Sequence, residues 1–215
     1  MMNSADLPDT LPLFPLAGAV LLPRARLPLH IFEPRYLAMI EDCLKSERRL
    51  IGMIQPRGEG ATGVPALVQV GCAGRLTSFS ETEDGRFMIT LTGIARFAVV
   101  EEVAGFVPYR RARVNFAPYL ADLEGPQTDP DLNRRTFLKD LGRYLQASKM
   151  GTDWSNLKEA DDEMLVNVLS MLCPFAPEEK QALLEAVTLP ERRRILETLI
   201  SFSLKSHGSG DETLQ

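Results

Sequence analysis

Residues 27–36 read LPLHIFEPRY, and they place a short alternating apolar run directly before a proline that can begin a helix. Pro34 suits the first helical position because its φ is already fixed and its missing N–H is not needed there. Five side chains then mark one face of a helix at the spacing i, i+3, i+4, i+7 and i+8: Tyr36, Met39, Ile40, Cys43 and Leu44. We therefore predict a corner in which a strand passes into an amphipathic helix.

Three polar residues, His30, Glu33 and Arg35, lie within this corner. One interpretation is a general acid/base pair oriented by an arginine. In the other interpretation, Glu33 accepts hydrogen bonds from the free N–H groups of the helix start, Arg35 pairs with a carboxylate on a neighbouring strand, and His30 makes one hydrogen bond from the opposite strand face. We favour this structural interpretation because buried polar groups need partners wherever they occur, and we predict no catalytic residue.

The sequence around this corner, up to about residue 116, is typical of short strands. Phe87, Ile89 and Leu91 alternate along one segment, which predicts a strand with one buried face. Asp84-Gly85 separates that segment from the preceding one and is a hairpin signal. The apolar run LIGMIQ, residues 50–55, predicts a buried strand with a parallel or mixed neighbour.

A stretch rich in proline and aspartate, residues 118–131, separates these strands from a part with helical periodicity. The apolar spacing there predicts four helices, at 130–147, 160–172, 177–187 and 190–203. The expected organisation is a flexible leader at 1–10, a strand-rich subdomain at 11–117, a helical subdomain at 118–204 and a disordered tail at 205–215.

The composition excludes several classes of function. The 215 residues have a net charge of −5 and 45% apolar residues, which are ordinary values for a globular protein, whereas a general nucleic-acid binder needs a dense basic face. Three widely spaced cysteines without a CxxC pair indicate reduced thiols in a cytoplasmic protein. The longest uncharged apolar run, residues 11–23, is too short to span a bilayer. With two histidines and no P-loop motif, we predict neither a metal nor a cofactor.

Candidate binding residues occur where a loop joins a strand, a place at which such residues often collect. They are Phe106, Pro108, Tyr109 and Arg110. Arg110 also forms a row with Arg111 and Arg113 that could line an RNA backbone, although charges that protect an edge strand are the commoner reason for such a row.

Several of these segments occur in the same order in the N-terminal substrate-binding domain of Lon protease, which the chain resembles over residues 11–116. The segments are LPLFPLAGAVLLPRARLPLHIFEPRYLAMIEDCL, LIGMI, VGCAGRL, DGRFMITLTGIARFAVV and PYRRARV. The later helices resemble the helical portion of the same family. The resemblance implies an α+β fold, in which a PUA-like, partly open β-barrel with one inserted helix is followed by an α-helical bundle subdomain. It also implies that the motif positions shape the fold: His30, Glu33, Arg35, Tyr36, Gly52, Gly71, Gly74, Gly93 and Phe97.

The resemblance further implies a role in engaging protein or peptide substrates. The ATPase and Ser-Lys peptidase of Lon proteases lie downstream of this domain, and the chain lacks a P-loop. We therefore expect a non-catalytic recognition module, an adaptor in protein quality control whose candidate partners are a protease or a chaperone, and we leave its oligomeric state open. RNA binding is the first alternative, and a small-molecule enzyme that uses His30, Glu33 and Arg35 is the second.

Overall fold

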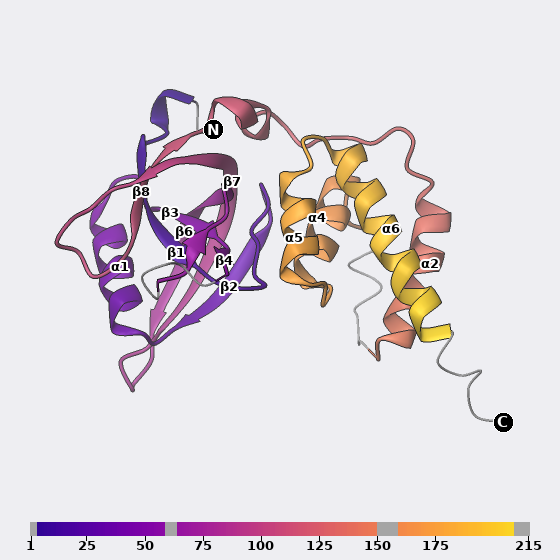
Figure 1. Cartoon of the computed structure of the whole chain (residues 1–215), viewed down its shortest axis with the longest axis horizontal. Helices are drawn as coiled ribbons and strands as arrows, with labels where there is room; N and C mark the ends of the chain where they lie inside the picture. The colour runs from indigo at the N-terminus through magenta and orange to yellow at the C-terminus, as the bar shows by residue number, and fades with distance from the viewer. Residues whose placement is uncertain (1–3, 59–63, 150–158, 209–215) are drawn as a thin grey trace. The chain divides into compact units, whose positions relative to one another are not determined.

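Six strands in the first part of the chain form one mixed sheet in the order β2-β7-β6-β3-β1-β8 (Figure 1). Their bounds are β1 Thr10–Pro15, β2 Arg26–Ile31, β3 Leu50–Ile54, β6 Val70–Glu81, β7 Phe87–Glu102 and β8 Arg111–Asn115. A further pairing between β7 and β8 closes five strands into a ring, and β2 extends the sheet beside β7. A second sheet pairs β4 (Pro56–Arg57) with β5 (Ala66–Leu67). The structure is a computed structural model that describes residues 4–58, 64–149 and 159–208.

The strand patterns predicted from the sequence are confirmed. Phe87, Ile89 and Leu91 are buried on one face of β7, and Met88 between them is exposed. Gly85 adopts a φ of 75° in the hairpin between β6 and β7, a conformation that glycine tolerates without strain. All of β3 is buried, and it pairs in parallel with β1 and antiparallel with β6, as its uninterrupted apolar run predicts.

Phe97 is completely buried between strands that approach each other closely because glycines face its ring. A Cβ atom on Gly52 would lie 2.9 Å from this ring, and a Cβ on Gly71 would lie 2.5 Å from the ring and 2.5 Å from a carbonyl oxygen of β3. Gly93 is equally confined, because its Cβ would overlap the backbone carbonyl of Leu22. Gly52 and Gly71 therefore allow the strands to close around Phe97, and Gly93 allows the close approach of the segment at Leu22.

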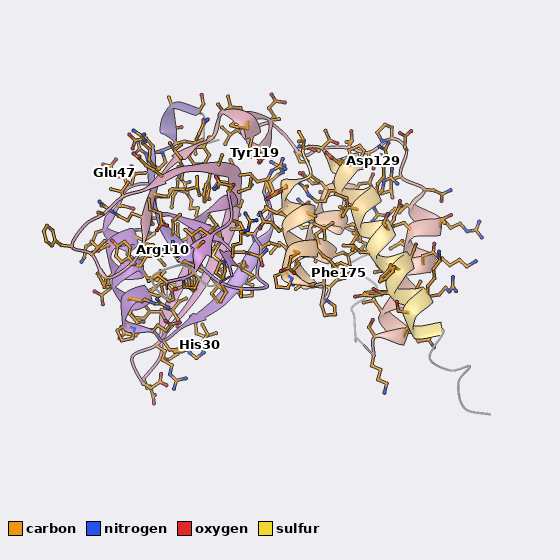
Figure 2. All side chains as sticks on the ribbon, viewed as in Figure 1. His30, Glu47, Arg110, Tyr119, Asp129 and Phe175 are labelled. Atoms are coloured by element: carbon orange, nitrogen blue, oxygen red, sulfur yellow. The ribbon has the colours of Figure 1, made fainter. Side chains whose placement is uncertain are left out.

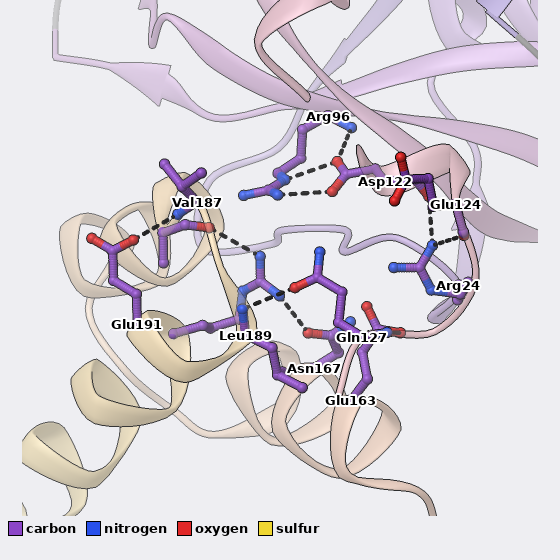
Figure 3. Close-up of polar contacts among 12 residues, drawn as sticks. Arg24, Arg96, Asp122, Glu124, Gln127, Glu163, Asn167, Val187, Leu189 and Glu191 are labelled. Carbon is purple, nitrogen blue, oxygen red and sulfur yellow. Dashed lines mark hydrogen bonds and ion pairs between the residues drawn. The ribbon is translucent and has the colours of Figure 1, made fainter. Parts of the chain in front are cut away.

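Arg96 and Asp122 form a buried ion pair that joins the 3-10 helix η2 (Ala117–Leu123) to β7 (Figure 3). The Asp122 carboxylate accepts hydrogen bonds from Nη2 of Arg96 at 2.8 Å, from its Nε at 2.9 Å and from its backbone N–H at 2.9 Å. On this side, β7 pairs with β2 as far as Thr92 and with β8 from Ala98 onward. The Arg96 N–H lies in the interval between the two partners, and Asp122 supplies the acceptor that a strand would otherwise provide.

The chain divides into two units, Met1–Gly125 and Pro126–Gln215. The sequence analysis places the change from strands to helices at residue 118, whereas the first unit keeps η2, because Asp122 completes the hydrogen bonding of β7. At the other end, the segment expected to be a flexible leader holds the 3-10 helix η1 (Ser4–Asp6) and the first residue of β1. Residues 1–3 lie outside the described residues.

The described part of the second unit contains four helices at the predicted places: α2 Arg134–Ala147, α4 Asp162–Leu172, α5 Pro177–Glu185 and α6 Leu189–Gly208. Their apolar stripes form one core, which includes Phe137, Leu141, Leu165, Leu183 and Leu196. The helix α6 continues to Gly208, so it includes the beginning of the segment 205–215 for which the sequence predicts disorder. Residues 209–215 lie outside the described residues.

Two arginines near the start of α6 are buried in this helical unit. Arg192 donates from Nε to the carbonyl oxygen of Leu183 and from Nη1 to Oδ1 of Asn167, both at 2.9 Å. Arg193 forms ion pairs with Asp129 and Glu197. These arginines therefore connect the helices to one another and to the segment that precedes α2.

The close packing around Phe97 predicts the effect of adding one methyl group. We expect Gly71→Ala to lower the unfolding free energy of the first unit by about 1–3 kcal/mol, because the new Cβ would overlap both β3 and the Phe97 ring. Gly125→Ala is the control, since a Cβ added at Gly125 would meet no atom within 4 Å. Urea denaturation should separate the two variants, and equal stability would contradict the packing argument.

Loss of the buried ion pair should lower the unfolding free energy more than Gly71→Ala does. Asp122→Ala leaves the Arg96 guanidinium buried without its carboxylate, and we expect a loss of about 3–5 kcal/mol in unfolding free energy. Glu124→Ala is the matched control, because Glu124 lies near Asp122 and its side chain is exposed. A calorimetric scan in which both variants melt together would show that the ion pair has no such role.

Candidate functional site

A groove of about 480 Å³ lies beside α1 (Pro34–Lys45) in the first unit, a volume within the roughly 300–1,000 Å³ range of ligand pockets. Its floor is formed by side chains that are almost completely buried: Leu11, Met39, Cys43 and Leu50. Its rim carries polar side chains from α1, from the turn after it and from the start of β8: Asp42, Ser46, Glu47, Arg48, Tyr109 and Arg111. Pro8, Thr10 and Pro12 line it along β1 and the residues before β1. The groove, which we call the α1 groove, therefore combines an apolar floor with a charged rim.

The end of α1 positions one side of the α1 groove. Ser46 is the C-cap, and its Oγ donates to the carbonyl of Cys43 at 2.8 Å and accepts from the N–H of Arg49 at 3.0 Å. Arg49 has a φ of 52°, so the chain turns sharply before it enters β3. This turn brings Glu47, which Figure 2 labels, and Arg48 to the rim.

Tyr109 and Asp42 connect the loop before β8 to α1 across the α1 groove. The Tyr109 hydroxyl donates a hydrogen bond of 2.8 Å to Oδ2 of Asp42, and Lys45 lies 3.4 Å from Oδ1 of the same carboxylate. Burial, together with this hydrogen bond, raises the pKa of Tyr109 to about 12. The phenol is therefore neutral at physiological pH and acts as a donor to a carboxylate that is already engaged.

Cys43 contributes a thiol to the floor of the α1 groove. Burial raises the pKa of this thiol to about 11, and the positive charge of Arg49 only partly opposes the effect. The thiolate is the nucleophilic form of cysteine, so a thiol that stays protonated at neutral pH is a poor nucleophile. Cys43 is therefore a packing residue.

The four candidate binding residues are distributed over different environments. Tyr109 lines the α1 groove, whereas Phe106 is fully exposed in the loop between β7 and β8, and Pro108 is also exposed. Arg110 donates to both carboxylate oxygens of Glu102 and, at 2.7 Å, to the carbonyl of Pro65. Arg110 thus holds the loop in place.

The corner at residues 30–35 is not the buried polar cluster that the sequence suggests. Glu33 is the N-cap of α1, but its carboxylate makes no capping hydrogen bond; its backbone carbonyl accepts from the N–H groups of Tyr36 and Leu37. The carboxylate instead pairs with Arg35 at 2.7 Å, and 43% of the Glu33 side chain and 54% of the Arg35 side chain are exposed. The predicted partner on a neighbouring strand is therefore wrong, because the helix start faces water and Pro34 has no N–H to satisfy.

His30 also lies on the surface, in β2, and its ring is 6.2 Å from that of the exposed Phe32. Among the described residues, no hydrogen bond joins it to Glu33 or Arg35, so the acid/base geometry is missing. Tyr36 is the buried member of this motif, and its ring packs 4.3 Å from that of Phe14. Figure 2 shows His30 and Arg110 in separate parts of the first unit.

The arginine row does not protect an edge strand. β8 pairs with β1 on one side and with β7 on the other, so it is not an edge strand that needs protecting charges. Arg110 and Arg113 form ion pairs with Glu102 and Glu101 of β7. Arg111 points to the α1 groove instead.

Asp42 and Ser46 line the groove but are not predicted from the sequence, and Arg111 is predicted only as part of a row that could line RNA. Asp42 lies next to the apolar stripe of α1, at a position that is normally solvated, and only the partner Tyr109 reveals its role. No group of three or more His, Cys, Asp or Glu side chains in the described residues could hold a metal ion. None of the helices in the same part of the chain has the length and hydropathy needed to cross a bilayer.

Comparison with known proteins places these features in a family. Residues 10–201 match the model of the ATP-dependent protease La (LON) substrate-binding domain. Lon protease 2 of Myxococcus xanthus is 24% identical over 204 residues, which are 94% of this chain and 24% of that protein. Lon protease 2 of Thermus thermophilus is 28% identical over 206 residues, with 92% and 25% covered. The chain thus spans about a quarter of the length of these curated relatives.

Two solved structures have the same fold. A Lon N-terminal domain protein from Xanthomonas campestris is 25% identical, with a TM-score of 0.59 over 90% of this chain and 98% of the other. The N-terminal domain of a Mycobacterium avium complex Lon protease gives a TM-score of 0.63 at 16% identity, covering 89% and 98% of the two chains. The α+β class expected from the sequence is confirmed.

The buried thiol in the α1 groove predicts a loss of stability at alkaline pH. Cys43 would ionise near 9.0 in the unfolded chain but only near 11 in the folded unit, so the unfolded state releases its proton first. The contribution of the protonated thiol to the free energy of unfolding is therefore fully present below pH 9 and is lost as the pH rises through about 11. The free energy of unfolding falls over this range by at most roughly 1.4 kcal/mol per pH unit. Urea denaturation between pH 8 and 11 should therefore show a shallower decline for Cys43→Ala than for the unchanged protein. Parallel declines would contradict the assignment, and Met39→Ala, a change at a buried floor residue that does not ionise, is the control.

Proposed function

Since the chain belongs to the ATP-dependent protease La (LON) substrate-binding domain family, we propose that it is a non-catalytic module that binds protein or peptide segments in the α1 groove. The family match over residues 10–201 is the observation that carries the proposal, because it covers both units and is to a substrate-binding module. The groove supports it, since an apolar floor with a polar rim suits a segment of mixed composition.

Tyr109 and Phe106 have different parts in this proposal. Tyr109 lies on the groove rim and offers an aromatic ring to a bound segment. Phe106 is an exposed aromatic residue beside Gly105 and Pro108, and it adds an apolar contact outside the groove. Arg110 fixes the loop that carries both residues through its ion pair with Glu102.

The proposed biological role is that of a recognition module or adaptor in protein quality control. A protease or chaperone would act on the chains that it binds, since the family match is to a substrate-binding domain. We also propose the cytoplasm as its location, which suits three buried cysteines that are all free. RNA binding has less support than peptide binding, because ion pairs neutralise Arg110 and Arg113. Enzyme chemistry at His30 also has less support, because Glu33 and Arg35 near it are exposed.

A peptide array tests the proposal. Twelve-residue peptides tiled over an unfolded protein should bind the full chain, and Thr10→Trp, which fills the groove, should weaken binding at least about tenfold. Ser80→Trp is the matched control, because Ser80 is an exposed strand residue outside the groove. Binding that survives Thr10→Trp unchanged, or an array without bound peptides, would refute the proposal.

A further inference from the structure

Arg111 differs from the two arginines beside it in the sequence. Arg110 and Arg113 are paired with glutamates of β7, whereas the Arg111 guanidinium has neither a hydrogen bond nor an ion pair among the residues that the structure describes. Its Nε is buried and has no acceptor. A buried N–H without an acceptor is unfavourable, and in this position it belongs to a cation, which makes the lack of a partner more costly still.

Arg111 lines the α1 groove together with Tyr109. The loop between β7 and β8 passes close to it, because a Cβ on Gly105 would lie only 3.5 Å from Nη2 of Arg111. The carboxylate of Asp42 already accepts from Tyr109 and lies beside Lys45, so its charge is engaged elsewhere. Since none of the described residues accepts a hydrogen bond from the Arg111 guanidinium, a molecule in the groove can supply an acceptor to it.

The rim carries two cations, Arg48 and Arg111, together with two carboxylates, Asp42 and Glu47. Arg48, a second arginine of the rim, is exposed and has no ion pair within the described ranges. The floor below is apolar, with Leu11 and Met39, and suits side chains better than a polynucleotide backbone. A nucleic acid would instead need a row of free cations, and two members of the Arg110–Arg113 row are already neutralised.

We propose that Arg111 binds a carboxylate of the protein segment in the α1 groove, so that the groove selects apolar segments that contain Asp or Glu or end in a free C-terminus. This inference rests on the proposed function and specifies its ligand class. Arginine is well suited to this task because its planar guanidinium can donate two parallel hydrogen bonds to one carboxylate.

Four fluorescein-labelled probes test the inference by anisotropy on the full chain. The first is a ten-residue peptide of alternating leucine and serine with one central Asp and blocked ends, and the second carries Asn in place of Asp. The third is the Asn peptide with a free C-terminal carboxylate, and the fourth is a ten-nucleotide polyuridylate. We expect the Asp peptide, the free-C-terminus peptide or both to bind about ten times more tightly than the blocked Asn peptide, as for the loss of a hydrogen bond to a charged group.

Two variants test whether Arg111 causes the preference for a carboxylate. Arg111→Gln should remove the preference for a carboxylate, while Arg113→Gln, which changes a paired and exposed arginine of the same strand, should keep it. The comparison of probes on the unchanged protein needs no variant, so it stands even where Arg111→Gln folds poorly.

The remaining outcomes overturn the inference. Equal binding of the Asp peptide and both Asn peptides would leave peptide binding in place but remove the role of Arg111. A polyuridylate that binds more tightly than every peptide, with loss of binding in Arg111→Gln, would assign the site to RNA. If no peptide binds, the proposed function fails together with the inference.

Discussion

The carboxylate of Asp122 accepts three hydrogen bonds from Arg96 at the point where β7 has left β2 and has not yet met β8. One of these bonds satisfies the backbone of β7, and the others hold the guanidinium, which also lies 4.7 Å from the centre of the Tyr119 ring. A residue more than twenty positions further along the chain thus completes the sheet. Because both side chains are almost completely buried, removal of either one would leave the charge of the other unpaired in an apolar environment.

The ion pair also supports the α1 groove, because it helps to fix β8, whose first residue lines the groove. The segment from β8 to η2 is held at one end by Asp122 and along its length by β1 and β7. The residues just before and at the start of β8 are Tyr109 and Arg111, which face α1 across the groove. The proposed recognition surface is therefore built on a strand and a helix, with Phe106 and Pro108 on the exposed loop. Such a scaffold keeps the positions of the binding groups defined before a ligand arrives.

Much of the fold follows from the sequence, because the signals are local. Pro34 and the apolar stripe after it predict α1, the alternation from Phe87 to Leu91 predicts β7, and the apolar spacing predicts the later helices. The site follows less well, because its contacts join residues that are far apart in sequence: Tyr109 meets Asp42, and Asp122 meets Arg96. Tyr109 was predicted as a binding residue from its place beside a loop, whereas nothing local distinguishes the unpaired Arg111 from the paired Arg113. The exposed pair Glu33–Arg35 shows the converse, since its sequence context suggested burial.

Amide hydrogen exchange of the full chain, with and without a saturating bound peptide, tests most directly whether the α1 groove is the surface that binds protein segments. We expect slower exchange on binding in residues 39–49 and 103–112, which border the groove. We expect unchanged exchange in residues 26–32 and 80–88, where Phe32 and Met88 are exposed apolar side chains outside the groove. Protection confined to the second pair of segments, with the groove unchanged, would contradict this expectation.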